Sequence, residues 1–285
     1  MQRTGVSSIT FPPTAETFLE LARVGITDYE LSLSYRDCER VNAASVAALA
    51  RASGITVSSY HLPFAEPEIL DLSSESTETR RRTVALFCKL IKRGSEAGIR
   101  RFIVHPSGEP VTTDEAPRAR RIAIARDTLA SLAEVAALHE AEIAVENLPR
   151  TCLGSTVSEM ETLISGNEKL SVCFDTNHLL TDREELFIER LGHKIRALHI
   201  SDYDRINERH WLAGEGDINW HGLYRRLISS GFDGVWLYEV LPHPKTILRE
   251  RDLTPGDLAR NAREIFSGQP ITTFSRRIDG LGMWH

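Results

Sequence analysis

The chain has 285 residues, of which 41% are hydrophobic and 26% charged, a balance typical of a water-soluble globular protein with a full core. Its formal net charge is −6 and it has no long basic run, which argues against a general nucleic-acid binder. No apolar run approaches the roughly 20 residues of a membrane span, so we expect no membrane partner.

Short apolar runs alternate with amphipathic segments along the chain. We expect the runs to form strands at residues 5–10, 26–33, 55–60, 101–105, 142–146, 170–175, 195–200 and 234–240. We expect helices in the other segments, the first beginning near Thr14 and the rest at 41–52, 78–97, 118–139, 157–164, 184–191, 221–230 and 258–266. Gly54, Gly98 and Gly268 stand just past three of these helices, where glycine commonly ends a helix.

This alternation of strand and helix predicts an α/β fold, a single-domain (β/α)8 TIM barrel over residues 1–267 followed by a C-terminal tail, 268–285. A doubly wound parallel sheet is the alternative. It is disfavoured because no glycine-rich phosphate-binding turn follows the first strand.

Each of the predicted strands from the fifth to the eighth has, at or near its carboxyl end, a residue of a type that binds metals. These residues are Glu146, Asp175, His199 and Glu239. Side chains at the carboxyl ends of barrel strands point into the barrel mouth, so the four are expected to converge. A barrel core can bury one Glu or His in a salt bridge, but four such residues on successive strands are hard to account for in this way. Three carboxylates and one imidazole suit a divalent cation such as Mn, Mg, Co or Zn.

Several motifs around these residues resemble the xylose isomerase-like TIM-barrel superfamily, which includes sugar isomerases, ketose 3-epimerases, inosose dehydratases and endonuclease IV. The motifs are His105-Pro106, Glu146-Asn147, Asp175-Thr-Asn-His178, Leu198-His-Ile-Ser-Asp202, Gly214-Glu-Gly-Asp-Ile-Asn-Trp220 and Glu239. The resemblance covers about residues 5 to 266, and it implies that Glu146, Asp175, His199 and Glu239 hold one divalent metal ion.

Similarity to the ketose 3-epimerases implies that His178 and Arg205 bind substrate, and Arg150 also matches their pattern. The chain departs from that pattern at Cys152, where those epimerases have a glutamate, which leaves the substrate open. Single histidines in such mouth positions line the substrate pocket of sugar-acting members. We therefore assign substrate binding to five residues: His61, His105, His178, Arg205 and His210.

The preferred hypothesis is a metal-dependent isomerase or epimerase of a small sugar, sugar phosphate or polyol-derived ketone. The metal would stabilise an enediolate formed when a C–H proton leaves. Glu146 and Glu239 are the expected catalytic bases, because they belong to the fifth and eighth strands and can approach the substrate from opposite sides. A dehydratase of the inosose type uses the same intermediate and stays open.

Endonuclease IV supplies a rival from another functional class, a zinc phosphodiesterase that acts on abasic DNA. The chain is similar to it at His61, His105, His178 and Glu208-Arg-His210, with Glu208 where that enzyme has Asp. Three zinc ions would then replace the single metal. The acidic net charge and the absence of a clear basic, aromatic wedge favour the carbohydrate substrate and no nucleic-acid partner. A barrel that only binds its ligand is a third possibility.

The remaining expectations concern the cellular setting. The first residues show no charged-then-apolar signal pattern, so we expect a cytoplasmic protein. The four cysteines lack CxxC spacing, which favours reduced thiols. The sequence leaves the oligomeric state open.

Overall fold

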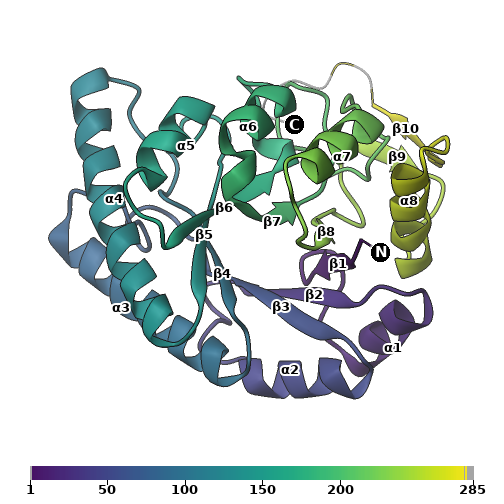
Figure 1. The fold of residues 1–285 in the computed structure, drawn as a ribbon, viewed down its shortest axis with the longest axis horizontal. Helices are drawn as coiled ribbons and strands as arrows, with labels where there is room; N and C mark the ends of the chain where they lie inside the picture. The colour runs from purple at the N-terminus through teal and green to yellow at the C-terminus, as the bar shows by residue number, and fades with distance from the viewer. Residues whose placement is uncertain (1, 279, 281–285) are drawn as a thin grey trace.

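The structure is a computed structural model that describes residues 2–278 and 280. Its main body is a ring of eight parallel strands surrounded by eight α-helices (Figure 1). The strands are β1 (Thr4–Ser7), β2 (Asp28–Ser32), β3 (Thr56–His61), β4 (Arg101–Val104), β5 (Glu142–Glu146), β6 (Leu170–Asp175), β7 (Ile195–His199) and β8 (Trp236–Tyr238). The helices are α1 (Ala15–Arg23), α2 (Ala43–Ala52), α3 (Thr77–Glu96), α4 (Glu115–Leu138), α5 (Val157–Ile164), α6 (Glu184–Leu191), α7 (Trp220–Ser229) and α8 (Pro255–Ser267).

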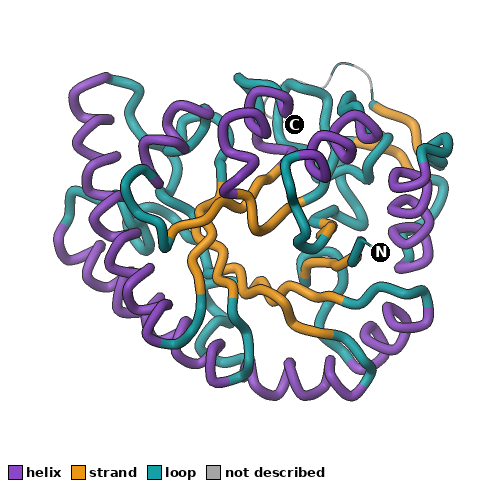
Figure 2. The backbone as a smooth tube through the Cα atoms, viewed as in Figure 1, coloured by secondary structure: helices purple, strands orange, loops and turns teal. Residues whose placement is uncertain are grey.

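The strands pair in chain order, and β1 also pairs with β8. The ring closes between β7 and β8 through Ile200, which forms a parallel bridge with Tyr238. The amide of Ile200 donates to the carbonyl of Leu237 at 2.8 Å, and the amide of Glu239 donates to the carbonyl of Ile200 at 3.1 Å. Figure 2 shows the barrel strands in orange at the centre and the helices in purple around them. The predicted TIM barrel is confirmed.

Helix ends follow local capping chemistry. α1 begins after Thr14, whose side chain accepts a hydrogen bond from the amide of Thr17 at 3.1 Å. α8 begins at Pro255, three residues before the predicted start, because Thr254 and Asp257 form a capping box ahead of the first apolar residue. The helix prediction followed apolar spacing and missed this box.

Two features of the strands differ from the prediction. β1 ends at Ser7 instead of residue 10, because the Ser7 carbonyl accepts hydrogen bonds from the amides of Thr10 and Phe11 and so closes a turn. A two-stranded antiparallel sheet of β9 (Ile247–Arg249) and β10 (Ser275–Arg277) was not predicted. Each of its strands has three residues, too short for a recognisable apolar pattern.

The predicted tail, 268–285, therefore includes a strand, β10, which pairs with β9 beside α8 (Figure 1). Residue 279 and residues 281–285, with Met283 and Trp284, lie outside the described residues. The division of the chain at residue 267 stays a prediction.

The barrel interior holds small and medium side chains. Ile103, Ala144, Cys173 and Ala197, one each from β4 to β7, form a buried cluster separate from the larger core. We call this cluster the interior layer. The neighbouring strand residues, such as Phe102, pack outward into the larger core beneath the helices. The alternation fixes which side chains face the barrel axis, and the candidate site depends on it.

None of the described helices is long and apolar enough to cross a membrane. Cys38, Cys88, Cys152 and Cys173, all among the described residues, are free cysteines.

Candidate metal centre and active site

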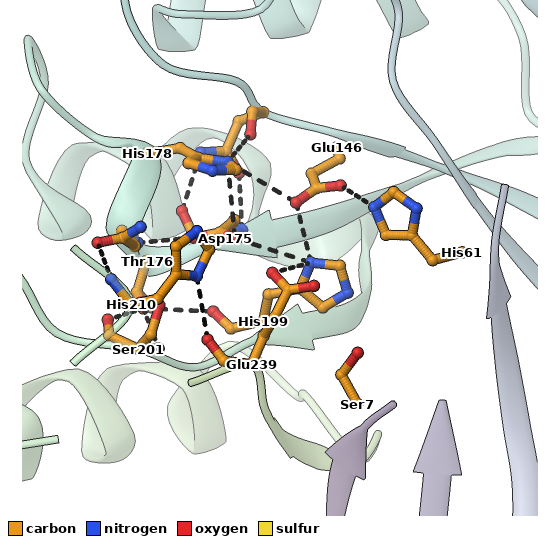
Figure 3. Close-up of polar contacts among 12 residues, drawn as sticks. Ser7, His61, Glu146, Asp175, Thr176, His178, His199, Ser201, His210 and Glu239 are labelled. Carbon is orange, nitrogen blue, oxygen red and sulfur yellow. Dashed lines mark hydrogen bonds and ion pairs between the residues drawn. The ribbon is translucent and has the colours of Figure 1, made fainter. Parts of the chain in front are cut away.

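Four ligand-type side chains meet above the interior layer, at the carboxyl ends of the strands (Figure 3). Glu146, Asp175 and His199 are the last residues of β5, β6 and β7, and each stands two positions after a residue of the interior layer. Strand alternation therefore turns all three to the barrel axis. Glu239 follows β8 directly. The sequence predicted this convergence, and the structure brings the four residues together.

The distances within this group fit a single ion. Each residue offers one ligand atom, and these atoms all lie within 4.8 Å of one another. Nδ1 of His199 lies 2.9 Å from a carboxylate oxygen of Glu146, 3.5 Å from one of Glu239 and 3.7 Å from one of Asp175. All four side chains are buried. We call these four residues the metal group.

The charge of the metal group calls for a cation. Oδ2 of Asp175 is buried without a hydrogen-bond partner among the described residues. Burial, together with the nearby carboxylates of Glu146 and Glu239, raises the pKa of Asp175 well above its usual value. Three buried carboxylates in one place are costly unless positive charge offsets them. Oxygen and imidazole donors suit divalent ions, so the residues present fit a bound divalent metal.

Asn147 and Asn177 hold the metal group in place. The side chain of Asn147 accepts from the Asp175 amide at 2.8 Å and donates to the Asp175 carbonyl at 2.9 Å, which fixes the end of β6 against that of β5. Oδ1 of Asp175 accepts from the Asn177 amide at 2.7 Å. Oδ1 of Asn177 in turn accepts from the His210 amide at 3.3 Å. These contacts explain why asparagines accompany Glu146 and Asp175 in the sequence.

Glu30 is a site residue that the sequence did not identify. It lies on β2, is 1% exposed, and places Oε1 3.0 Å from Nε2 of His199. Its other oxygen accepts a hydrogen bond from the Ser59 hydroxyl at 2.7 Å. Burial alone would raise the pKa of Glu30, but the charge of His199 lowers it. Glu30 therefore lies against Nε2 of His199, and the other ring nitrogen, Nδ1, faces the metal group.

Three predicted substrate-binding histidines surround Glu146. Nε2 of His61 and Nε2 of His105 lie 3.0 and 3.1 Å from the same carboxylate oxygen, Oε2. Nδ1 of His178 lies 3.7 Å from the other oxygen, Oε1. Burial would lower the pKa of His61, but the hydrogen bond to Glu146 and its charge raise it to about 9. Although burial by itself would raise it, the charges of His199 and His105 lower the pKa of Glu146.

His210 reaches the same region from the long loop, 201–219. Its Nδ1 lies 3.1 Å from the carbonyl of Glu239, and its ring packs edge-on against His178. Glu208, two residues before it, lies 3.5 Å from Nε2 of His178. His178, Glu208 and His210 therefore form a second polar cluster beside the metal group.

The structure does not bring Arg205 to this site. Its guanidinium pairs with Glu184 at 2.6 Å and with the hydroxyl of Tyr203 at 3.0 Å, away from the metal group. Arg150 lies by the site instead, held by both oxygens of Glu109 at 2.8 and 2.7 Å and lying 3.2 Å from Glu208. A single arginine in a loop gives no sequence signal that distinguishes these two positions.

Asp202 organises the loop 201–219. Its buried carboxylate accepts hydrogen bonds from Trp220 Nε1 at 2.7 Å, from the Gly214 amide at 2.8 Å and from the Tyr203 amide at 2.9 Å. Gly216 packs directly against it, and a Cβ there would lie 2.1 Å from Asp202 Oδ1 and 2.3 Å from the Tyr203 carbonyl oxygen. The lack of a side chain at Gly216 thus allows the loop backbone to approach Asp202 closely.

We expect Gly216→Ala to destabilise the protein by about 2 kcal/mol or more, because overpacking against fixed backbone forces the loop to shift. Denaturant unfolding measures the change. Gly256→Ala is the matched control, since its Cβ would meet only the Thr254 hydroxyl, at 3.6 Å, within α8. Equal stability of the two variants would contradict this account of the loop.

A cavity of about 1050 Å³ opens above the metal group. Glu146 and Glu239 line it, whereas Asp175 and His199 are fully buried and are not among its lining residues. Its polar walls include His61, His105, His178, His210, Arg150 and Glu208. Cys152, which stands where the epimerase pattern has a glutamate, also lines it. A small molecule in the cavity would therefore face the carboxylates of Glu146, Glu239 and Glu208, four histidines and the guanidinium of Arg150.

Comparison with known proteins agrees with this architecture. The model of the family described as xylose isomerase-like TIM barrel matches residues 5–264. A crystal structure of a D-tagatose 3-epimerase-like protein superposes with a TM-score of 0.77 and 21% sequence identity, over 94% of this chain and 97% of that chain.

Curated relatives match over shorter stretches. An uncharacterized protein of Methanocaldococcus jannaschii is 27% identical over 183 residues, 61% of this chain and 61% of that protein. Fructoselysine 3-epimerase of Escherichia coli O157:H7 is 34% identical over 55 residues, 19% of this chain and 20% of that enzyme. The matched regions thus cover less than two thirds of either relative.

Proposed function

This chain belongs to the xylose isomerase-like TIM barrel family, and on that premise we propose that it is a divalent-metal-dependent epimerase or isomerase of a small ketose or related sugar. One observation carries the proposal: Glu146 and Glu239 reach a common point with Asp175 and His199 and also line the cavity above it. The 3-epimerase relatives support the choice of a ketose.

The metal group would hold one divalent ion. Mn, Mg, Co and Zn ions all accept carboxylate oxygens and imidazole nitrogens as ligands. When bound, the ion would supply positive charge that stabilises negative charge developing on substrate oxygens.

Glu146 and Glu239 are the proposed bases. They come from different strands, so one carboxylate removes the C–H proton beside the ketose carbonyl and the other returns a proton. Return from the second carboxylate to the other face inverts the carbon, which is epimerisation. His61, His105, His178 and His210 would hold the substrate hydroxyls, together with Arg150 in place of Arg205.

Solvent exchange tests this proposal. Metal-depleted protein is compared with protein loaded with Mn²⁺, Mg²⁺, Co²⁺ or Zn²⁺, each incubated in deuterium oxide with D-fructose and other ketoses. We expect deuterium at the carbon beside the carbonyl, and a new epimer, only with metal present. Metal-loaded protein that exchanges no proton on any ketose would refute the proposal.

Glu30→Gln should lower the affinity for the divalent ion by about 10–100-fold, the usual effect of losing the outer partner of a metal-bound histidine. Titration calorimetry measures this without any substrate. Asp28→Asn is the control, because Asp28 is a buried carboxylate on the same strand that pairs with Arg3 instead of His199. Unchanged affinity in Glu30→Gln would remove Glu30 from the site.

A zinc phosphodiesterase is the second candidate, and one observation favours it. His61, His105 and Glu146 form a further group whose ligand atoms lie within 4.8 Å of one another. The cluster of His178, Glu208 and His210 lies beside the metal group as well. Additional ions at these two places would give clustered zinc, which activates water in phosphodiester cleavage. The number of ions bound per chain separates the candidates.

A further inference from the structure

The cavity above the metal group is larger than a free ketohexose needs. Its volume is about 1050 Å³, whereas pockets of about 300–1,000 Å³ already enclose drug-sized ligands. The lining extends past the polar site to the segment 63–72, which follows β3, and to α3. Part of the cavity therefore lies beyond the reach of a small sugar held at Glu146 and Glu239.

The wall of this additional part is apolar. Leu70, Leu72 and Phe87 line it and are otherwise buried, at 4%, 1% and 4% exposure. Phe64 lines the same cavity on the solvent side. We call these four residues the apolar arm. Side chains of this kind recognise hydrocarbon or aromatic surface and do not orient hydroxyl groups.

The carboxylates near the apolar arm are already paired. Asp71 forms an ion pair with Arg121, and Glu109 forms a two-pronged pair with Arg150 at 2.8 and 2.7 Å. The other charged lining residues on this side, Arg36, Asp37 and Glu66, are exposed at the rim. Among the described residues that line this side of the cavity, each charged side chain is therefore either paired or exposed at the rim.

Phe64 is the member of the apolar arm that lies beside the candidate active site. Its ring stacks on His105, with centroids 5.0 Å apart and planes 18° apart, and His105 contacts Glu146. The side chain is 57% exposed, so a large apolar surface stands open beside the metal group. A ligand that covered this ring would remove apolar area from water.

We propose that the substrate is a ketose carrying an uncharged alkyl or aryl substituent, with the ketose at Glu146 and Glu239 and the substituent in the apolar arm. This inference rests on the proposed function and narrows it to substituted ketoses.

The test compares four probes on the Mn²⁺-loaded protein: D-fructose, 1-anilino-1-deoxy-D-fructose, 6-O-benzyl-D-fructose and D-fructose 6-phosphate. Calorimetry gives the affinity for each, and solvent deuterium exchange gives kcat/KM. The two aryl probes differ in the end of the ketose that carries the ring. We expect at least one aryl probe to bind at least about tenfold more tightly than D-fructose. Its kcat/KM should be higher than that of D-fructose by a similar factor.

The variant Phe64→Ala should reduce the preference for the aryl ketose over D-fructose by about tenfold. The loss of contact with a small apolar group in a pocket has an effect of this size on specificity. Leu138→Ala is the matched control, since Leu138 is 83% exposed at the end of α4, far from the cavity lining. It should leave the preference unchanged. Circular dichroism establishes that both variants are folded.

Each outcome decides one claim. Exchange on D-fructose without tighter binding of either aryl probe, or a preference for the phosphate, overturns the apolar-arm inference and leaves the proposed function standing. Tight, Phe64-dependent binding of an aryl ketose without exchange on any probe supports the arm and overturns the epimerase. An aryl preference that survives Phe64→Ala also overturns the inference.

Discussion

Glu239→Gln is expected to lower the exchange of the substrate C–H proton with solvent by about 10³-fold, the typical contribution of a positioned acid–base group. Glu239 lines the cavity and lies in the metal group at the end of β8, so its carboxylate is placed to transfer a proton. The amide of glutamine has nearly the same shape but cannot accept that proton. Mass spectrometry of ketose incubated in deuterium oxide measures the exchange.

The assay must separate proton transfer from metal loss, because a glutamine amide is also a weaker metal ligand than a carboxylate. Exchange is therefore measured at saturating metal, with the bound ion quantified in the same sample. Glu189→Gln, an exposed carboxylate on α6, controls for the change of net charge. Exchange at the wild-type rate in metal-loaded Glu239→Gln would exclude Glu239 as a base.

The convergence of Glu146, Asp175, His199 and Glu239 was predictable because two simple patterns coincide. Buried parallel strands appear in the sequence as continuous apolar runs, so their ends can be located within a few residues. Parallel strands in a barrel also present their carboxyl ends at one face. Ligand-type residues at four such ends must therefore lie near one another, whatever the conformation of the loops between them.

The role of Glu30, and which of Arg150 and Arg205 lies at the site, were harder to predict, for different reasons. Glu30 lies inside a strand whose pattern also permits a solvent-facing glutamate, and only the register of β2 places it 3.0 Å from His199. Arg150 and Arg205 both belong to mouth loops, where backbone direction is set by tertiary contacts. Both residues have positive φ, 52° and 65°, a conformation that sequence patterns do not reveal for arginine.

The cavity and the small sheet of β9 and β10 depend on contacts between distant segments. The apolar arm exists because the segment 63–72 and α3 leave space beside the barrel mouth, which no local pattern encodes. β9 and β10 are separated by α8 in the sequence. Arg249 of β9 forms a buried ion pair at 2.7 Å with Glu215 of the loop 201–219. Such long-range pairings lie beyond the range of hydrophobic periodicity.

Asp175→Ala should remove the bound metal and with it all ketose exchange, whereas His105→Ala should retain one ion per chain. Asp175 contributes to the metal group a buried oxygen that has no hydrogen-bond partner among the described residues. Its loss should weaken metal affinity by more than about 100-fold, which exceeds the usual effect of removing a residue that only hydrogen-bonds a metal ligand. His105 instead contacts Oε2 of Glu146, while Oε1 faces His199. Metal content by mass spectrometry, with calorimetric titration, measures both variants.

The same pair of variants distinguishes sugar chemistry from DNA cleavage. In a zinc phosphodiesterase, His105 would be the ligand of an additional ion, so His105→Ala would release metal from a protein that holds several ions. Wild-type protein would then also cleave abasic duplex with steep salt dependence. The loop 201–219 favours sugar chemistry, because Arg205 and Arg209 are its only arginines or lysines. They pair with Glu184 and Asp204, at 2.6 and 2.9 Å, and are not displayed for phosphate contacts.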